Sequence, residues 1–434
     1  MAEKLAELHL ADLHALAAEL GVERFRMLRR DELVREIEAK RGSGDVERPS
    51  PGDRPAPAAA APAAEPEGGD AAIPAPERER ELLETDETEE IEGVLEVTPQ
   101  RYGFLRVRGL EADPEDVYVS ASQIRRCQLR TGDRVGGPVR AARRGERHRA
   151  LVHVDRVNGA EPRSVDRPEF ERLTPIVPTR RLTLDGDPAD VLTRAVDLLT
   201  PVALGQRVLV EAAPRSGRTT LLRGLARAIA VASDVEVTVL LIDERPEEAT
   251  AWREEVAEAE IASATADLAP IEQSRLAELA LGRVRRRAEE GRDAVLIVDS
   301  LSRLAVASGD AATVKRLFGS GRELAEEGAG SVTVIATVVE GAEDEGAAEQ
   351  AVATTESSLI RLDPSLAAAG IFPALRAGEC RISNEDELRG PDELAAVRRL
   401  RSLLADLDPA ESASLIRERI EGSRTNAELL RDLS

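Results

Sequence analysis

Residues 1–42 have apolar side chains at the spacing of a helix. Leucines recur at steps of three to five residues, at Leu5, Leu8, Leu13, Leu16 and Leu20. This spacing predicts a helix with one apolar face, and Gly21 has the place of its C-cap. A second helix is predicted from about residue 30 to residue 40. We therefore expect a small helical module, which could be a protein-docking unit or a weak nucleic-acid binder.

Residues 43–90 lose this periodicity. Prolines stand among alanine, glycine and glutamate, at Pro51, Pro55, Pro57, Pro62, Pro66, Pro74 and Pro76. Because so few apolar side chains cannot offset the entropy lost on ordering, we predict a flexible linker. Its acidic end, residues 79–90, is a solvated run of charge.

Residues 91–163 contain short runs with the alternation of strands. Residues 94–97 and 150–154 are such runs, and turn residues such as Thr131-Gly132-Asp133 and Gly136-Gly137 lie between them. Several short strands within a segment of this length are typical of a five-stranded barrel of the OB or cold-shock type.

Residues 165–434 contain longer apolar segments instead. Valine, leucine and isoleucine dominate residues 207–213, 235–242, 294–298 and 331–338, as in strands that are buried on both faces of a parallel sheet. The apolar residues of segment 218–230 recur at helical spacing, so we expect a helix directly after the first strand. The order predicts an α/β domain with a mostly parallel sheet.

Composition excludes several classes of function. The 434 residues carry a net charge of −23, so the chain is no general polycation, and any nucleic-acid site must be local. Two cysteines, Cys127 and Cys380, supply neither a disulfide framework nor a metal set, which suits a reducing cytoplasm. The four histidines form two pairs five residues apart, which puts the members of each pair on different faces and argues against metal binding. We expect no signal peptide and no membrane span.

A phosphate-loop pattern follows the strand at residues 207–213. The usual pattern is G-x-x-x-x-G-K-[ST]. Here Ala212 replaces the first glycine and Arg218 replaces the lysine, whereas Gly217 and Thr219 match. Backbone N–H groups at a helix N-terminus bind phosphate, and a threonine hydroxyl here can bind Mg²⁺. Because the pattern is damaged, an ordinary turn before a helix is the alternative.

Acidic residues follow two other apolar segments. Glu244 comes after residues 235–242, and Asp299 comes after residues 294–298. Since parallel strands end at one edge of a sheet, where α/β domains receive ligands, we expect both acids beside the phosphate loop. Asp299 then has the place of the acid that holds Mg²⁺. Alone it could also be a helix N-cap, but the three features together favour a nucleotide site.

The predicted barrel carries a candidate RNA site. Aromatic residues make up 2% of the chain, yet both tyrosines, Tyr102 and Tyr118, lie in this segment with Phe104. Tyr102 and Phe104 are two residues apart on one strand and so share a face. Exposed rings beside arginines stack unpaired bases, and the segment has fourteen arginines against ten acids. The alternative is that the rings fill the barrel core; the interleaved arginines favour RNA.

These motifs resemble, in order and over nearly the whole chain outside the linker, the transcription termination factor Rho family of bacterial hexameric RNA-dependent helicases. The stretches that carry the resemblance are residues 102–106, 116–126, 129–133, 213–219, 240–248 and 299–305. The family's phosphate loop also commonly has alanine as its first residue. The resemblance implies a multidomain protein with a helical module (1–42), a linker (43–90), an RNA-binding OB/cold-shock barrel (91–163) and a RecA-like P-loop ATPase domain (165–434).

The resemblance also implies roles for individual residues. The primary RNA site would be lined by Tyr102, Phe104, Arg106, Tyr118 and Arg147. ATP would be surrounded by Ala203, Leu204, Gly205, Gln206, Arg207, Val208, Arg215, Ser216, Gly217, Arg218, Thr219, Thr220, Arg245 and Phe372, the last by stacking on adenine. The catalytic set would be Glu244, which polarises the attacking water, Arg245 beside it, and a neighbour's arginine finger, Arg381 or its rival Arg376. Thr219 and Asp299 would hold Mg²⁺.

The resemblance implies the setting of the protein as well. Its cofactors would be ATP and Mg²⁺. Its partners would be single-stranded RNA, further copies in a homo-hexamer, and RNA polymerase with its transcription complex. The protein would act in the cytoplasm, without a membrane.

The chain departs from the family pattern in the nucleotide domain. Arg218 replaces the lysine, and residues 308–313 are shorter than the family's RNA-gripping loop. Residues 351–355 lack the lysine and glycines of a second such loop, and Gly370 stands where the family has arginine. Three hypotheses follow: a divergent ATP-driven RNA translocase that ends transcription, a paralogue that binds RNA and nucleotide but hydrolyses poorly, or a subunit of mixed rings with a standard Rho.

Overall fold

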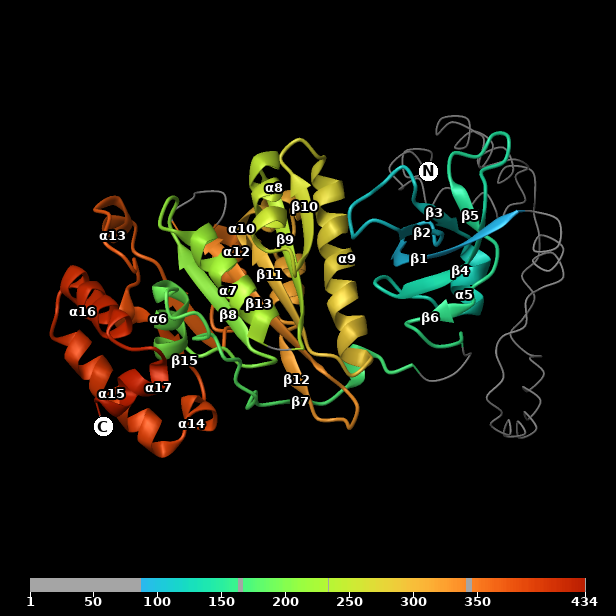
Figure 1. Cartoon of the computed structure of the whole chain (residues 1–434). Helices are drawn as coiled ribbons and strands as arrows, with labels where there is room; N and C mark the ends of the chain where they lie inside the picture. The colour runs from blue at the N-terminus through green and yellow to red at the C-terminus, as the bar shows by residue number, and fades with distance from the viewer. Residues whose placement is uncertain (1–86, 163–166, 233, 341–345, 434) are drawn as a thin grey trace, which may run out of the picture. The chain divides into compact units, whose positions relative to one another are not determined.

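The computed structural model describes residues 87–162, 167–232, 234–340 and 346–433. The expected helical module (1–42) and nearly all of the expected linker (43–90) lie outside these residues. The described chain forms a small β-barrel, drawn in blue to cyan in Figure 1, and a larger α/β domain, drawn from green to red. Both predicted fold classes are therefore confirmed.

Five strands close the barrel, as the alternating runs predict. They are β1 (Thr88–Val97), β2 (Gly103–Arg106), β3 (Val117–Val119), β5 (Arg149–Leu151) and β4 (Arg134–Arg140), in that order round the barrel, with β4 pairing back to β1. All neighbours are antiparallel except β3 and β5. The short strand β6 (Arg156–Val157) adds to β4, and helix α5 (Ala121–Arg126) follows β3.

The first strand begins three residues before the expected end of the linker. Thr88 pairs with Arg140, and Glu89 pairs with Val139. Residues 88–90 are therefore part of a strand, although their acidic composition predicts a solvated run. A strand at the barrel surface tolerates charged side chains as long as its backbone groups are paired.

Aliphatic side chains fill the inside of the barrel. They include Leu95, Leu105, Val117, Val119 and Val135, each fully buried. No aromatic ring belongs to this cluster within the described residues. The alternative that Tyr102, Phe104 and Tyr118 fill the barrel core is therefore wrong.

The α/β domain is built on one mixed sheet whose central strands are parallel. The order is β10 (Glu260–Thr265), β9 (Glu236–Glu244), β11 (Ala294–Asp299), β13 (Ser331–Val339), β8 (Arg207–Ala212), β14 (Ser358–Arg361) and β15 (Arg381–Ile382). The first six are parallel, and β15 is antiparallel to β14. Two short strands, β12 (Arg322–Leu324) and β7 (Pro175–Ile176), extend from β13 through antiparallel pairs. All four strands predicted from apolar segments are confirmed.

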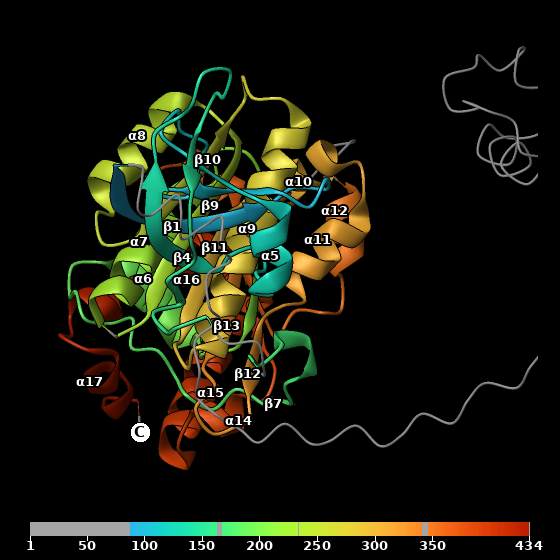
Figure 2. The same ribbon diagram turned by 90° about the vertical axis from the view of Figure 1, so that its right-hand side faces the viewer.

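Successive residues of the central strands point into two different cores. On β11, Val295 and Ile297 belong to one buried cluster, whereas Leu296 and Val298 belong to the other. Burial on both faces explains why these strands are continuous apolar segments rather than alternating ones. Figure 2 shows helices on both sides of the sheet, with α6, α7 and α8 on one side and α10, α11 and α12 on the other.

The helices that cover the sheet follow its strands along the chain. On the first side they are α6 (Val191–Leu199), α7 (Arg218–Ala232) and α8 (Pro246–Glu255). On the second side they are α9 (Pro270–Glu289), α10 (Leu301–Ser308), α11 (Ala311–Phe318) and α12 (Gly346–Val352). The chain then continues through α13 (Pro364–Ala368), α14 (Glu385–Leu388), α15 (Pro391–Ala405), α16 (Pro409–Glu421) and α17 (Asn426–Arg431). The predicted helix 218–230 is confirmed as α7.

A buried arginine joins α6 to the end of α16. Arg194 is fully buried. Its Nη1 donates to the carbonyl oxygens of Ile420 at 3.0 Å, Ser423 at 2.9 Å and Pro188 at 3.2 Å, and its Nη2 donates to Ser423 Oγ at 3.0 Å. The last carbonyls of a helix have no partner within the helix, so Arg194 caps α16 from another element.

Helices α10 and α11 are joined by only two residues. Gly309 adopts the left-handed conformation with φ +61° and ends α10. Asp310 is the N-cap of α11, and its side chain accepts a hydrogen bond from Ala312 N at 2.9 Å. The segment 308–313, which is shorter than the corresponding family loop, therefore forms a tight turn between two helices.

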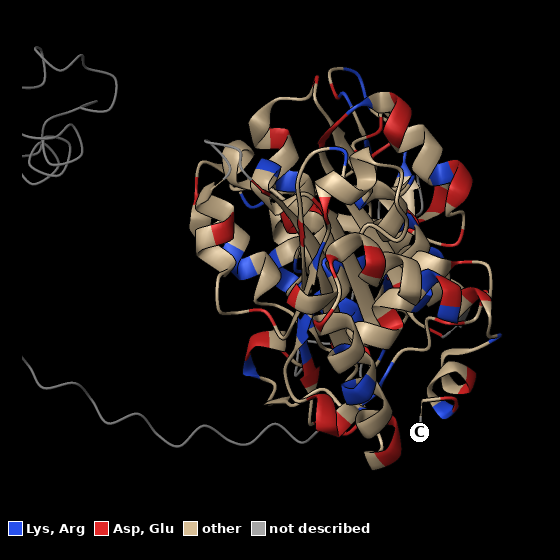
Figure 3. Cartoon of the chain, turned by 90° about the vertical axis from the view of Figure 1, so that its left-hand side faces the viewer, with Lys and Arg blue, Asp and Glu red and all other residues tan. Residues whose placement is uncertain are grey.

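Charges of both signs are interspersed over the α/β domain. In Figure 3, positions of basic residues (blue) and of acidic residues (red) occur on many of the same helices. Many arginines pair with acids from other elements, such as Arg181 with Asp197 at 2.8 Å and Arg401 with Glu385 at 2.6 Å. Much of the acidic excess is thus accompanied by nearby arginines. No helix in the described part of the chain is long and apolar enough to cross a bilayer.

Both cysteines are buried, which predicts low thiol reactivity. Burial raises the pKa of the Cys380 thiol to about 11, and Cys127 is 2% exposed. Since the thiolate is the reactive form, we expect Cys380 in native protein at pH 8 to react with Ellman's reagent about a hundredfold more slowly than in protein unfolded by guanidinium chloride. Raising the pH towards 11 should speed native labelling. Two fast thiols in native protein at pH 8 would contradict the burial.

Candidate nucleotide and nucleic-acid sites

The phosphate loop connects the carboxyl end of β8 to the first turn of α7. Gly217 has a φ of +95° and Arg215 has a φ of +65°. A side chain at residue 217 would be strained by this backbone, which explains the glycine. The Oγ of Ser216 is turned back to the Ala213 carbonyl, to which it donates at 2.8 Å. The loop thus leads into a helix N-terminus, as an anion site requires.

Arg218, the first residue of α7, does not extend into solvent. Its Nε lies 3.0 Å from Asp299 Oδ1, and its Nη2 lies 3.4 Å from Glu244 Oε1. The side chain is only 14% exposed. The structure therefore brings together all three features on which the sequence prediction depended, and it joins them through the residue that departs from the pattern.

Asp299 ends β11 and is almost fully buried. Thr337, on the neighbouring strand β13, donates from Oγ1 to Asp299 Oδ1 at 3.2 Å. Burial raises the pKa of Asp299, while the nearby Arg218 acts in the opposite direction. Thr337 was not predicted as a site residue, because the pairing of β11 with β13 cannot be read from either segment alone.

Glu244 ends β9 and faces two arginines. Besides Arg218, the Nη1 of Arg303 forms a hydrogen bond to Glu244 Oε1 and lies 3.4 Å from the Ile242 carbonyl. Arg303 belongs to the first turn of α10, whose N-cap is Ser300. It is a site residue that the sequence prediction missed. The only sequence feature that could have identified Arg303 was its position in residues 299–305, one of the stretches that carry the family resemblance.

Other predicted nucleotide residues lie at the same edge of the sheet. Thr219 and Thr220 are in the first turn of α7. Arg245 follows β9, with its side chain 77% exposed and 3.5 Å from Glu248. Phe372 is 39% exposed and follows α13, beyond the carboxyl end of β14. Since β8, β9 and β14 are parallel, these residues come from one edge.

Residues 203–208, also expected to surround ATP, lie at the opposite end of β8 from the phosphate loop. The nitrogen of Gly205 donates to Thr333 Oγ1 at 2.8 Å, and Arg207 Nη1 donates to the Gly321 carbonyl at 2.8 Å. Residues 207–212 form the strand itself, so about 17 Å of strand separates this end from the phosphate loop. The structure does not bring Ala203, Leu204, Gly205, Gln206, Arg207 and Val208 to the loop of the same chain.

The two candidate arginine fingers differ in their surroundings. Arg376 lies between Asp363 and Glu340, at 3.5 Å from each. Arg381 is exposed on β15, and its guanidinium makes no ion pair within the described residues. Arg381 is therefore the one of the two whose charge is not already matched by a carboxylate in the described chain.

The residues expected to hold Mg²⁺ do not fit the ion as they stand. Thr219 supplies a hydroxyl, but Asp299 already has a cationic partner in Arg218. Within the described residues, no group of three or more acidic, histidine or cysteine side chains could hold a metal ion. A magnesium ion at Asp299 would have to displace the guanidinium.

The three aromatic rings of the barrel lie together on its surface. The ring centroid of Tyr102 is 5.7 Å from that of Phe104 and 5.7 Å from that of Tyr118. His148, which was not predicted, packs edge-on against Phe104 at 5.0 Å. Tyr118 is 37% exposed, and the other two aromatic rings are half-buried. We call Tyr102, Phe104, Tyr118 and His148 the aromatic cluster.

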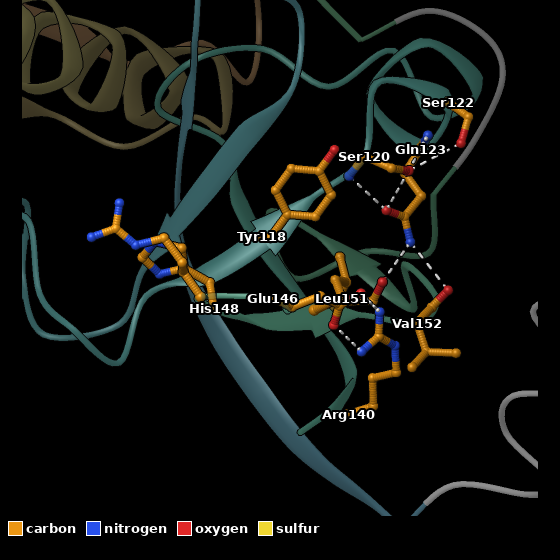
Figure 4. Close-up of a pocket in the computed structure, with 11 residues that line it drawn as sticks. Tyr118, Ser120, Ser122, Gln123, Arg140, Glu146, His148, Leu151 and Val152 are labelled. Atoms are coloured by element: carbon orange, nitrogen blue, oxygen red, sulfur yellow. Dashed lines mark hydrogen bonds and ion pairs between the residues drawn. The ribbon is translucent and has the colours of Figure 1, made fainter. Parts of the chain in front are cut away.

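A pocket of about 500 Å³ adjoins the aromatic cluster. Tyr118, Arg147 and His148 line it, and Figure 4 shows Tyr118 beside Ser120 and Gln123. Gln123 is fixed by hydrogen bonds to the carbonyls of Leu151 at 3.0 Å and Val152 at 3.1 Å. The pocket thus combines the rings of Tyr118 and His148, the Arg147 side chain, which makes no ion pair within the described residues, and fixed polar groups, which suits an unstacked base.

Charges in the barrel are partly neutralised by neighbours. Arg140 holds the pKa of the Glu146 carboxyl at about 2, with help from the backbone of Arg143. Arg106 forms ion pairs with Glu96 and Asp116. Although burial opposes its charge, these acids keep the pKa of Arg106 above its usual value. Of the side chains predicted to bind RNA, that of Arg106 therefore already forms ion pairs with acids of the barrel.

Family comparisons cover all three parts of the chain. Residues 91–163 match the model for the RNA-binding domain of Rho termination factor. Residues 4–41 match the model for the N-terminal domain of the same factor. Residues 193–320 match the nucleotide-binding domain of the ATP synthase alpha/beta family.

Curated relatives match over most of the chain. Transcription termination factor Rho of Aquifex aeolicus is 36% identical over 79% of this chain and 84% of its own length. The Chromobacterium violaceum factor is 37% identical over 77% of this chain and 86% of its own length. The Mycobacterium leprae factor is 35% identical over 82% of this chain. The chain spans only 62% of the length of that relative and 53% of the Streptomyces lividans one.

Solved structures support the fold of the nucleotide domain. A type III secretion system ATPase of pathogenic bacteria matches with a TM-score of 0.50, at 20% identity, over 65% of this chain and 93% of its own. The ATP synthase subunit NeqB of Nanoarcheaum equitans matches with a TM-score of 0.50, at 15% identity, over 64% of this chain and 82% of its own. At these identities the likeness concerns the fold alone.

Proposed function

The chain belongs to the family of transcription termination factor Rho, and on this premise we propose that it is an RNA-dependent ATPase and helicase that releases transcripts. The observation that carries the proposal is the convergence of the phosphate loop, Glu244 and Asp299 at one edge of the sheet. Nucleotide binding is supported by the matching nucleotide-binding domain, and RNA binding by the matching barrel.

In this proposal the barrel holds single-stranded RNA. Bases stack on Tyr102, Phe104 and Tyr118, while Arg147 contacts the backbone or a base at the adjoining pocket. Base stacking tolerates many sequences because every base has a flat face. Arg106 acts from behind: paired with Glu96 and Asp116, its guanidinium lies 5.9 Å from the Phe104 ring centroid and supports that ring.

The phosphate loop binds the triphosphate of ATP. Residues Arg215 to Thr220 surround the phosphates through backbone N–H groups and the Thr219 hydroxyl, and Phe372 stacks on adenine. Glu244 orients the attacking water. To do so, its carboxylate gives up the contact with Arg218 and accepts a hydrogen bond from the water instead. Arg303 keeps the carboxylate in place during this exchange. Arg245, exposed beside Glu244, completes this side of the site.

The proposed assembly is a homo-hexamer that acts on the transcription complex with RNA polymerase. Arg381 then serves as the finger that a neighbouring copy supplies to stabilise developing charge on the phosphate. Its exposure and its lack of an ion pair within the described residues support this choice over Arg376. Residues 203–208, remote from the loop of their own chain, have no role in this nucleotide site as we propose it.

A second function is favoured by the turn between α10 and α11. Gly309 and Asp310 leave no loop at the position where the family grips RNA inside the ring. Arg218 further ties up both acids that hydrolysis needs. The second candidate is therefore a paralogue that binds RNA and nucleotide, hydrolyses poorly, and acts as a regulatory binding protein in the cytoplasm.

The rate of ATP turnover by the purified full chain, with and without poly(C), tests the enzyme. We expect turnover that poly(C) stimulates and that Glu244→Gln abolishes. We also expect Arg218→Lys to raise stimulated turnover about tenfold or more, because a compact ammonium reaches the β- and γ-phosphates and frees Glu244. Wild-type turnover at the Glu244→Gln level under both conditions, with RNA binding retained, would replace the enzyme with the second function.

A further inference from the structure

Two carboxylates at the phosphate loop, Asp299 and Glu244, both face Arg218, and Glu244 also pairs with Arg303. Asp299 is 1% exposed and Glu244 is 8% exposed, so neither is well solvated by water. A buried carboxylate without a counter-charge is strongly disfavoured. In most such sites a divalent cation contributes to this charge when nucleotide binds. Here Arg218 already contributes it.

The shape of the guanidinium lets one residue do this. Its Nε faces Asp299 at 3.0 Å and its Nη2 faces Glu244 at 3.4 Å. Its Nη1 makes no hydrogen bond or ion pair within the part of the chain that the structure describes. A planar fork can therefore bridge two acids and still have donors for a phosphate oxygen, whereas a lysine ammonium has a single nitrogen.

Replacing Arg218 by a metal ion is unfavourable for two reasons. The ion would have to break an ion pair whose acid is nearly fully buried. Magnesium also gives up its water reluctantly and needs near-octahedral oxygen ligands, whereas Asp299, the acid expected to bind it, already pairs with Arg218 through Oδ1. The Thr337 hydroxyl already donates to the same Asp299 oxygen, at 3.2 Å.

We propose that this site binds a nucleoside triphosphate without a divalent cation, with the Arg218 guanidinium in the place that the ion has in related sites. The inference rests on the proposed nucleotide site. It assigns to Arg218 a role as substitute counter-charge: the guanidinium neutralises Asp299, shares Glu244 with Arg303, and donates to the phosphates.

Calorimetric titration of the full chain with ATP, once with Mg²⁺ and once with excess EDTA, tests the inference. For the wild type we expect Kd values within about threefold of each other. For Arg218→Lys we expect Kd to rise at least tenfold when Mg²⁺ is removed, because a single ammonium cannot pair with the buried Asp299 and bind phosphate at the same time. Thermal unfolding of each variant verifies that it is folded.

Arg223→Lys is the matched control. Arg223 lies on the same helix, is also 14% exposed, and also bridges two acids, Glu248 and Glu255, at 2.9 Å each. We expect this variant to bind ATP like the wild type in both conditions. A response to Mg²⁺ removal as large as that of Arg218→Lys would overturn the special role of Arg218.

The wild-type titrations alone separate the remaining outcomes. Tight binding with Mg²⁺ and at least tenfold weaker binding in EDTA would overturn the inference and leave the nucleotide site intact. No binding of ATP in either condition would instead overturn the proposed nucleotide function itself. Because these outcomes come from the unaltered protein, they do not depend on whether a variant folds.

Discussion

Replacing Tyr102 and Phe104 together by alanine is expected to weaken the binding of pyrimidine-rich single-stranded RNA by roughly thirtyfold or more. Stacking on an aromatic ring contributes about 1–3 kcal/mol per base, and this change removes two of the rings in the aromatic cluster. Neither ring belongs to the barrel core, so the barrel should keep its fold. The measurement is fluorescence anisotropy of a labelled oligo(C) with the full chain.

Phe372→Ala is the control for this experiment. Phe372 is also an exposed aromatic residue, at 39% exposure, but it belongs to the nucleotide domain. We expect it to leave RNA affinity unchanged and to weaken ATP binding. Equal RNA affinities for the double variant and the wild type would refute the stacking role. A lost far-ultraviolet strand signal in the double variant would be the sign that the barrel itself had been damaged; Tyr118→Ala, in which the other two rings remain, would then decide by its own loss of affinity.

Arg194→Leu is expected to lower the free energy of unfolding of the α/β domain by about 3 kcal/mol or more. The change removes the donor of three carbonyl oxygens and of the Ser423 hydroxyl. The Ile420 carbonyl keeps hydrogen bonds from Ser423 N at 3.1 Å and Ser423 Oγ at 3.2 Å, but the carbonyls of Pro188 and Ser423 lose the Arg194 donor, and each buried acceptor left without a partner costs about 1–3 kcal/mol. Urea unfolding gives the global effect, and amide hydrogen exchange in α16 should show the local one, because opening of that helix becomes easier.

Arg399→Leu is the matched control for Arg194. Arg399 is exposed on α15 and donates to one carbonyl, that of Leu433, at 2.7 Å. Exposed substitutions of this kind usually change stability by no more than about 0.5 kcal/mol. An equal and small effect of both changes would mean that water or another donor satisfies the carbonyls at the end of α16.

The architecture was predictable because each part of the chain repeats one simple pattern. The apolar segments at residues 235–242 and 331–338 became β9 and β13, since strands buried on both faces need no polar positions. Strands β10 and β14 were not predicted. The first, Glu260–Thr265, is rich in small residues, and the second has only four residues, so neither has a distinctive pattern.

The candidate site was predictable only where a motif lies within one segment. The phosphate loop and the acids after two strands were found in this way. The contacts of Arg303 with Glu244 and of Thr337 with Asp299 join separate segments, so they depend on strand register. Arg106 was expected at the RNA site from the family resemblance, and its ion pairs with Glu96 and Asp116 could not be read from the sequence.

Residues 203–208, which the family resemblance assigns to the nucleotide site, show how strand geometry separates neighbouring segments. They precede the phosphate loop closely in sequence, but the six-residue strand β8 lies between them and carries the chain from one edge of the sheet to the opposite edge. Proximity along the chain therefore becomes distance in space. A helix of the same length would have kept the two segments within about 9 Å of each other.

The two-residue connection of Gly309 and Asp310 limits what mechanical work this domain could do. A motor that translocates along RNA needs a mobile loop that contacts the RNA, moves with it and then releases it. Because α10 and α11 are joined by only two residues, there is no such loop between them. Under the second candidate function, the protein would therefore be expected to remain bound at one place on a transcript, with a long residence time, rather than to move along it.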